Sequence, residues 1–309
     1  MNIDEKIIEW LLAGDISIRY QVKRDLLGKN DKILRNKIDK EGWAAEYLKR
    51  QKGNGHWGRS FYFPKWTSTH YTLLDLKNLC ITPKNSSVHK ALDLIFENEM
   101  NSTQKSITPN RIVSADICIN GMVLNYASYF QVDEDRLISI IDYLIANQME
   151  DGGYNCHSTR IGAIHSSLHT TLSVLEGFFE YKVNGYKYRL NDINKIEKDC
   201  IEFILQHRLF KSDKTGKIIN ESFKRFPYPY RWRYDILRCL DFFACSKHKY
   251  DERMKDALDF LLSKQNKEGL WKLSAKYPGK IHFEMEKAGR PSRWNTLRAS
   301  RVLKHYQLL

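Results

Sequence analysis

The apolar residues of this chain recur at helical spacing along most of its length. In residues 133–148, for example, Leu137, Ile141 and Leu144 fall on one face of a helix. Runs in which apolar and polar residues alternate, as they do in half-buried strands, are rare. We therefore expect an all-α protein.

The helices that this spacing predicts are separated by polar or glycine-containing connections. They cover residues 4–28 with a break at Gly14-Asp15, 31–51, a segment that begins at Thr67, 86–99, 114–130, 133–148, 165–181, 191–207, 230–245, 251–265 and 292–306. Residues 100–113 and 208–229 are expected to be loops. The helices come in pairs whose second member is the more apolar, which is typical of an outer and an inner layer. A closed double ring of about five to six helical hairpins explains this best, and an open solenoid is the alternative.

A short phrase, Gln-x3-Gly-x-aromatic, closes three of the predicted helices. Its copies are Gln51/Gly55/Trp57, Gln148/Gly152/Tyr154 and Gln265/Gly269/Trp271. The glutamine can bind exposed backbone groups at a helix end, the glycine permits a left-handed turn, and the aromatic ring buries a large area. Three copies at one internal spacing indicate a structural repeat rather than a catalytic motif.

These phrases resemble the repeats of squalene and terpene cyclases and of protein prenyltransferase beta subunits, which are alpha/alpha toroids. The segments that begin at His165 (His-Ser-Ser-Leu-His-Thr-Thr) and at Pro291 (Pro-Ser-Arg-Trp-Asn-Thr-Leu-Arg-Ala) are similar to bacterial proteins labelled squalene-cyclase-like. The resemblance implies an alpha/alpha toroid over residues 51–309, with residues 1–50 as an N-terminal helical cap of the same domain.

Composition narrows the class of protein. Hydrophobic residues make up 42% and charged residues 28% of the chain, as in soluble globular proteins. We expect no membrane span, because no run of about 18 apolar residues occurs. The sequence also lacks a signal-peptide pattern, and its six cysteines are irregularly spaced, so we expect a cytoplasmic protein with reduced thiols. The oligomeric state stays open.

The net charge of +13 favours an anionic partner. A phosphorylated or otherwise anionic small molecule is the partner that we expect. Nucleic acid ranks lowest, because the basic residues are dispersed and no nucleic-acid-binding motif occurs. The simpler alternative is a lysine-rich surface without a function of its own.

In a toroid, the starts of the inner helices converge on one mouth of a central cavity. The polar residues at the predicted starts are His70, Asp116 with Cys118, His165 with His169, Tyr234 with Asp235, and Arg293 with Asn295. From this set we take His70, Asp116 and Asp235 as candidate catalytic residues.

Two resemblances point to zinc. Asp116-Ile-Cys118 and His169-Thr170 are similar to the zinc-binding parts of protein prenyltransferases, and Cys118 with Cys156-His157 is similar to the zinc ligands of lanthionine cyclases. They imply a catalytic zinc site of Cys118, Cys156 and His169 with an open fourth position. Asp116 would be either a fourth zinc ligand or a residue that contacts one of the ligands. The alternative is that the cysteines are core residues and the histidines line a polar cavity.

A second group of candidates is the arginine- and aromatic-rich segment 225–234. Such residues can hold a diphosphate or stack on a ring. The candidate substrate-binding residues are Arg225, Tyr228, Tyr230, Arg231, Arg233 and Tyr234, together with His165 and Arg293. The alternative for the segment is a packed aromatic loop with surface arginines.

The resemblance leaves the reaction open. The Asp-x-Asp-Asp acid motif and the Asp-rich motifs of terpene cyclases are absent, so cyclisation is unsupported. Our first hypothesis is a zinc-dependent, transferase-like enzyme or metal-assisted hydrolase that acts on a thiol or water and an anionic, isoprenoid-type substrate. The alternative is a metal-free toroid that binds a hydrophobic or glycan ligand, without catalysis or as a sugar-processing enzyme that pairs Asp235 with Glu284 or Glu286.

Overall fold

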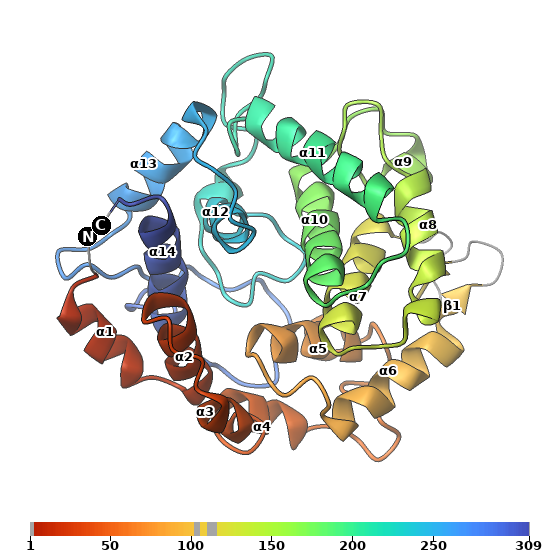
Figure 1. Ribbon diagram of the computed structural model, residues 1–309, viewed down its shortest axis with the longest axis horizontal. Helices are drawn as coiled ribbons and strands as arrows, with labels where there is room; N and C mark the ends of the chain where they lie inside the picture. The colour runs from red at the N-terminus through yellow and green to blue at the C-terminus, as the bar shows by residue number, and fades with distance from the viewer. Residues whose placement is uncertain (1–2, 102–105, 110–115, 309) are drawn as a thin grey trace. The chain divides into compact units, whose positions relative to one another are not determined.

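The computed structural model describes residues 3–101, 106–109 and 116–308 (Figure 1). Helices dominate the described residues, and the prediction of an all-α fold is confirmed. Two two-residue strands, β1 (Met100–Asn101) and β2 (Ser106–Ile107), pair antiparallel within a stretch that we expected to be a loop. The first residues of the helix expected from Ser114 lie outside the described residues.

The chain divides into two compact units, which are described separately here. Unit 1 comprises Met1–Lys49, Asn78–Thr82 and Leu205–Leu309, and unit 2 comprises Arg50–Lys77 and Pro83–Ile204. The division of the sequence into a cap of residues 1–50 and a toroid of residues 51–309 stays a prediction.

Unit 2 holds both candidate zinc-binding cysteines. Its helices are η2 (Lys65–Thr67), α5 (Thr69–Asn78, whose last residue belongs to unit 1), α6 (Ser86–Asn98), α7 (Ile117–Tyr129), η3 (Glu134–Arg136), α8 (Ile138–Ala146), α9 (Ser158–Ile161), α10 (Leu168–Val183) and most of α11 (Leu190–Gln206).

Unit 1 holds the arginine- and aromatic-rich segment. Its helices are α1 (Glu5–Leu12), α2 (Ile16–Gln21), the π-helical turn η1 (Val22–Leu26), α3 (Lys32–Lys37), α4 (Gly42–Leu48), η4 (Glu221–Lys224), α12 (Ile236–Cys245), η5 (Glu252–Met254), α13 (Lys255–Ser263) and α14 (Arg293–His305).

The single helix predicted over residues 31–51 is wrong, because the structure has two helices there. Gly42 adopts a left-handed φ of 68° and begins α4. A side chain at this position would collide with Asp15, whose carboxylate accepts a hydrogen bond from the amide of Trp43 at 2.8 Å. The close approach of α2 and α4 therefore breaks the helix.

The helices alternate between buried and half-exposed members, as predicted. In unit 2, 11 of the 13 residues of α7 are buried, but only 3 of the 9 residues of α8. In unit 1, 8 of the 10 residues of α12 are buried, but only 3 of the 9 residues of α13. The fold class is thus all-α, and it consists of helical hairpins that each pair an inner with an outer helix. Hairpins of this kind build alpha/alpha toroids.

The three Gln-Gly-aromatic phrases form the same turn. In each copy the glutamine side-chain amide donates to the glycine carbonyl, at 2.8, 3.2 and 3.1 Å, and the glycine φ lies between 78° and 87°. The aromatic rings of Trp57, Tyr154 and Trp271 are at most 1% exposed. Their backbone amides donate to a threonine hydroxyl in the first turns of the next inner helix: Thr69, Thr171 and Thr296. All three copies of the phrase thus have the same local structure.

The inner helices α7 and α10 pack most closely of all helix pairs in unit 2 (Figure 1). Gly121 and Gly177 make this possible. A Cβ atom at Gly121 would meet the carbonyl oxygen of Ser173 at 2.8 Å, and one at Gly177 would meet the carbonyl oxygen of Gly121 at 2.5 Å. The starts of α7 and α10, which carry candidate site residues, are held together by this contact.

No helix among the described residues combines the length and apolarity needed to cross a membrane.

Candidate functional site

The starts of α7 and α10 and the turn before α9 bring five polar residues together in unit 2. We call Asp116, Cys118, Cys156, Arg160 and Thr170 the thiol centre. Asp116 precedes α7 as its N-cap, Cys118 is the second residue of α7, and Thr170 is the third residue of α10. Cys156 lies in the turn after the second Gln-Gly-aromatic phrase, and Arg160 lies on α9. The sequence predicted the meeting of Asp116, Cys118 and Cys156 but not the parts played by Arg160 and Thr170.

The sulfur of Cys156 is surrounded by hydrogen-bond donors. The backbone amide of Cys118 donates to it at 3.2 Å, and the hydroxyl of Thr170 at 3.5 Å. The thiol of Cys118 is a third donor, and its hydrogen bond is the main reason that the pKa of Cys156 lies below its usual value. The same hydrogen bond, together with burial, raises the pKa of Cys118. The pair therefore favours one thiolate, on Cys156, beside one neutral thiol.

Asp116 is the acidic member of the thiol centre. It is 7% exposed, and its Oδ2 forms an ion pair with Arg160. Its Oδ1 is buried without a hydrogen-bond partner among the described residues. Burial raises the pKa of Asp116, while the positive charges of Arg160 and Lys65 act against this shift. Arg160 and Lys65 thus offset the negative charge of Asp116 at the centre.

Two tyrosines border the thiol centre. Burial, with smaller contributions from Asp116 and the cysteines, raises the pKa of Tyr62 and Tyr143. Both phenols are therefore neutral at physiological pH and present weakly polar walls. The hydroxyl of Tyr62 also lies 3.2 Å from that of Tyr71.

His70 contacts Tyr62, one of the two tyrosines that border the thiol centre. Its ring centroid is 5.5 Å from that of Tyr62, and its Nδ1 is 3.3 Å from the hydroxyl of Tyr126. The residue is fully buried, and burial lowers the pKa of His70 to about 3. His70 is therefore a neutral imidazole, and its catalytic role stays a prediction.

The third predicted zinc ligand, His169, is half-buried near the start of α10, and His165 is exposed before that helix. Over residues 3–101, 106–109 and 116–308, no three His, Cys, Asp or Glu side chains gather closely enough to hold a metal ion. The structure thus brings the two cysteines together without completing the predicted donor set.

Unit 1 contains a second polar cluster, centred on Tyr230. The guanidinium groups of Arg238 and Arg298 lie 4.3 and 5.2 Å from the centre of its ring. Asp235, the N-cap of α12, is 1% exposed and accepts a hydrogen bond from the amide of Arg238 at 2.8 Å. Burial raises the pKa of Asp235 to about 6, against the opposing effect of Arg298. We call Tyr230, Asp235, Arg238 and Arg298 the arginine–aromatic cluster.

The sequence pointed to Tyr230 and Asp235 but missed both arginines of this cluster. Arg238 and Arg298 lie inside the inner helices α12 and α14 and are at most 2% exposed. An arginine at a position that helical spacing places among the apolar residues of an inner helix was the available signal, because buried arginines need a partner.

The other predicted substrate-binding residues of unit 1 have local partners. Tyr228 stacks on Trp294 with ring centroids 4.1 Å apart, and Arg233 lies 4.5 Å from the centre of the Tyr277 ring. Arg231 is buried and has a φ of 60°.

Three further candidates serve the packing of unit 1. Arg225 is exposed and donates to the carbonyl of Ala275, and the hydroxyl of the buried Tyr234 donates to the carbonyl of Leu209. Arg293 donates to the carbonyl of Trp10 at 2.9 Å and lies over its ring.

The two glutamates that could pair with Asp235 are also engaged. Glu284 forms an exposed ion pair with Lys276. Glu286 accepts hydrogen bonds from the hydroxyl of Ser292 at 2.5 Å and from the amide of Arg293 at 2.7 Å, so it caps α14.

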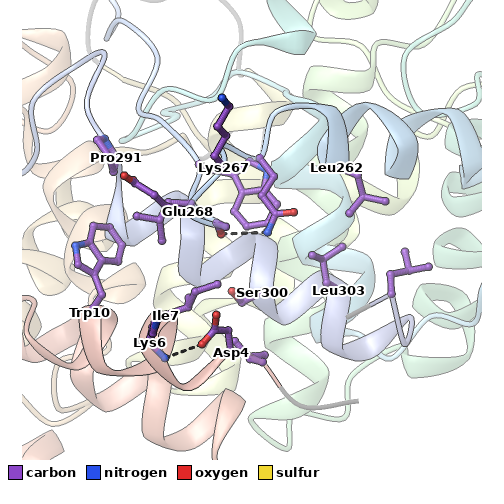
Figure 2. A pocket seen from close by; sticks show the side chains of 16 residues that line it. Asp4, Lys6, Ile7, Trp10, Leu262, Lys267, Glu268, Pro291, Ser300 and Leu303 are labelled. Carbon is purple, nitrogen blue, oxygen red and sulfur yellow. Dashed lines mark hydrogen bonds between the residues drawn. The ribbon is translucent and has the colours of Figure 1, made fainter.

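Unit 1 also has a pocket of about 1050 Å³ between α1, α14 and the third Gln-Gly-aromatic turn (Figure 2). Trp10, Ile7 and Leu303 contribute apolar walls, and Lys267 and Glu268 place one charge of each sign beside it. None of the site residues predicted from the sequence lines this pocket. Its walls suit an apolar ligand group, but the charges beside it favour neither sign.

Comparisons with known proteins give similarity in structure only. No protein-family model matches the chain, and no curated protein matches it. A polysaccharide lyase is similar over 96% of this chain and 95% of its own, with 13% identity and a TM-score of 0.49. The type II terpene cyclase MstE from Scytonema, solved with geranylgeranyl dihydroxybenzoate as substrate, is similar over 99% of this chain and 100% of its own, with 14% identity and a TM-score of 0.37. Similarity at this level says nothing of the substrate or reaction of this chain.

Proposed function

We propose that the protein is a thiol-dependent enzyme whose reactive group is the thiolate of Cys156, and that its substrate is an anionic small molecule. The observation that carries the proposal is the set of three donors around the Cys156 sulfur: the Cys118 amide, the Thr170 hydroxyl and the Cys118 thiol. A sulfur in such surroundings holds negative charge at neutral pH more readily than an ordinary thiol. The positive charges of Arg160 and Lys65 support an anionic substrate.

The proposed reaction begins with the sulfur of Cys156. It donates an electron pair to an electrophilic carbon of the substrate, and a C–S bond forms while the breaking bond's electron pair leaves with an anionic group. Arg160 and Lys65 stabilise that developing charge. Water or a substrate thiol then attacks the same carbon, loses its proton to solvent, and displaces Cys156 as a thiolate. No base has to act on Cys156, because the nucleophile is already ionised.

Alkylation with two reagents of different charge tests both parts of this proposal. Cys156 should react with iodoacetamide faster at pH 7 than N-acetylcysteine, which is the reference for an ordinary thiol. It should also prefer the anionic iodoacetate over neutral iodoacetamide more strongly than N-acetylcysteine does. The Arg160→Gln variant should lose about half or more of this preference, because one positive charge is removed.

The ratio of the two rates is independent of the thiolate fraction, so it reports the charge around the sulfur alone. An iodoacetate preference at Cys156 equal to that of N-acetylcysteine would refute the anionic substrate. A Cys156 rate that rises only above about pH 8.5, the ordinary thiol range, would refute the thiolate.

Zinc bound to Cys118 and Cys156 is the second candidate. Two thiols in hydrogen-bond contact are donors that zinc favours, and Asp116 would be the nearest oxygen donor if Arg160 released it. Bound zinc would keep both sulfurs ionised. We derive no catalytic step through zinc, because the described residues do not gather a third donor. Elemental analysis of protein purified without a metal-affinity tag should then find about one zinc per chain, lost in Cys118→Ser. Equal zinc content in both proteins would exclude this site.

For the arginine–aromatic cluster we propose the role expected from the sequence, which is to hold an anionic group of a ligand. The Nη1 atom of Arg298 supports this, because it is buried without a hydrogen-bond partner among the described residues, and an unsatisfied charged donor is costly. Inorganic phosphate should raise the melting temperature of the wild type but not of Arg298→Met. The exposed Arg225→Met variant is the control and should respond like the wild type. An equal response of all three proteins would refute this role.

A further inference from the structure

The two cysteines of the thiol centre are connected by hydrogen bonds. The thiol of Cys118 hydrogen-bonds the sulfur of Cys156, and the backbone amide of Cys118 also donates to that sulfur at 3.2 Å. The first contact depends on a side-chain rotamer, but the second is fixed by the first turn of α7. The Cys156 sulfur is therefore held against the backbone of its partner cysteine.

The other cysteines differ in their surroundings. Cys200 hydrogen-bonds the carbonyl of Gly152, while Cys80 and Cys245 each accept a hydrogen bond from an arginine. Cys239 is fully buried in α12. Among the described cysteine contacts, only that of Cys118 and Cys156 joins two sulfurs.

The pair is also chemically unequal. The sulfur of Cys156 accepts hydrogen bonds from the amide of Cys118 and the hydroxyl of Thr170. Cys118 supplies the second sulfur, which lies within hydrogen-bond reach of Cys156. In thiol–disulfide exchange, a dithiol needs one sulfur that attacks and a second, nearby sulfur that resolves the mixed disulfide. These two residues have the arrangement for both parts.

We propose that Cys118 and Cys156 form a redox-active dithiol, which a low-molecular-weight disulfide oxidises reversibly to an intramolecular disulfide. The thiolate of Cys156 attacks one sulfur of the small disulfide, forms a mixed disulfide and releases a thiolate. Cys118 then loses its proton to solvent and attacks the Cys156 sulfur, which releases the second small thiol. In total the two cysteines lose two electrons and Cys118 loses one proton; the small disulfide gains the two electrons and leaves as two thiolates, which take up protons from solvent.

This inference uses the same nucleophile as the proposed enzyme, and it adds a state in which that nucleophile is absent. When Cys156 is bonded to Cys118, its sulfur can no longer attack a substrate or bind a metal. A thiol-reducing agent restores the active form by the reverse exchange. The protein would thus be active only while its surroundings keep the pair reduced.

The test is to treat the full-length reduced protein with oxidised glutathione, block the remaining thiols with N-ethylmaleimide, and measure the intact mass. The wild type should lose two of its six free thiols and gain no glutathione, and peptide mapping should join the segments that contain Cys118 and Cys156. Reduction should return all six thiols. Cys118→Ser should stop at a glutathione adduct on Cys156, and Cys156→Ser should keep its five thiols.

Cys245→Ser is the matched control and should still form the disulfide. A wild type that accumulates the Cys156–glutathione adduct would overturn the inference, as would one that keeps six thiols. In either case, rapid alkylation of Cys156 at neutral pH would leave the proposed enzyme standing. Slow alkylation of Cys156 in the reduced wild type at neutral pH, with disulfide formation intact, would instead refute the enzyme proposal and support the dithiol.

Discussion

Replacement of Asp235 by asparagine should remove a pH-dependent loss of stability. Asp235 is 1% exposed, and the charged groups that face it are Arg238 and Asp241 on α12 and Arg298 on α14, with the phenol of Tyr277 nearby. Burial outweighs the two arginines and raises the pKa of Asp235 to about 6 from 3.8. Asparagine keeps the oxygen that accepts the helix-capping hydrogen bond from Arg238 but cannot ionise.

The sign and size of the effect follow from the two pKa values. Between pH 3.8 and about 6 the folded protein holds a proton on Asp235 that the unfolded chain has released, so the free energy of unfolding falls as pH rises through this window. One pKa unit corresponds to about 1.4 kcal/mol, and the difference of about two units therefore amounts to about 3 kcal/mol. Below the window, both states are protonated and Asp235 contributes no pH dependence.

Urea unfolding at several pH values between 4 and 6.5 measures this effect. The stability of the wild type relative to Asp235→Asn should fall by about 2 kcal/mol across this range, most of the full effect, because all other titrating groups cancel in the difference. Asp251→Asn is the control: the hydrogen bond from Arg253 lowers the pKa of Asp251 to about 2, so its stabilising effect is complete above pH 3.8 and is lost only below the window. The quantity to compare is the free energy of unfolding of the wild type minus that of Asp235→Asn. If this difference stays flat or rises with pH, the burial argument is refuted.

Three other predictions concern packing and the thiol centre. Gly121→Ala should destabilise the protein by about 1–3 kcal/mol in urea unfolding, because its methyl group meets a backbone carbonyl, whereas Gly53→Ala, with no atom within 4 Å, should change stability little. Trp271→Ala should cost about 3–5 kcal/mol, since it removes a buried ring together with a 2.8 Å hydrogen bond to a backbone carbonyl; a loss below about 1 kcal/mol would contradict this. Thr170→Val should raise the pKa of Cys156 by removing a donor, and an unchanged alkylation profile would contradict that role.

The structural repeat could be predicted from the sequence because its parts are local. The glutamine, the glycine and the aromatic residue stand at a fixed spacing within one turn. A comparison of the sequence with itself therefore finds them. The threonine that binds each aromatic residue's amide could not be found in this way. It follows Trp57 by 12 residues, Tyr154 by 17 and Trp271 by 25, because the connections between them differ in length.

The candidate site was only partly predictable for the same reason. Cys118 and Cys156 could be paired because each stands next to the start of an inner helix or to a repeat turn. Which of the two sulfurs accepts hydrogen bonds depends on contacts that residue spacing does not reveal. These are the hydrogen bonds that the Cys118 amide and the Thr170 hydroxyl donate to Cys156. Arg298 was missed because a helical pattern marks which face is buried, but not which donor atom of a buried arginine lacks a hydrogen-bond partner.

The central claim is that Cys156 ionises more readily than an ordinary thiol. An ultraviolet titration of thiolate absorbance measures this most directly. The absorbance of Cys156→Ser is subtracted from that of the wild type at each pH, both proteins being reduced and freed of metal by a chelator. The account predicts a difference curve whose midpoint lies below about 8.5, the value of a free cysteine, and which moves upward in Thr170→Val. A midpoint at or above that value would contradict the account, since Cys156 would then be an ordinary thiol.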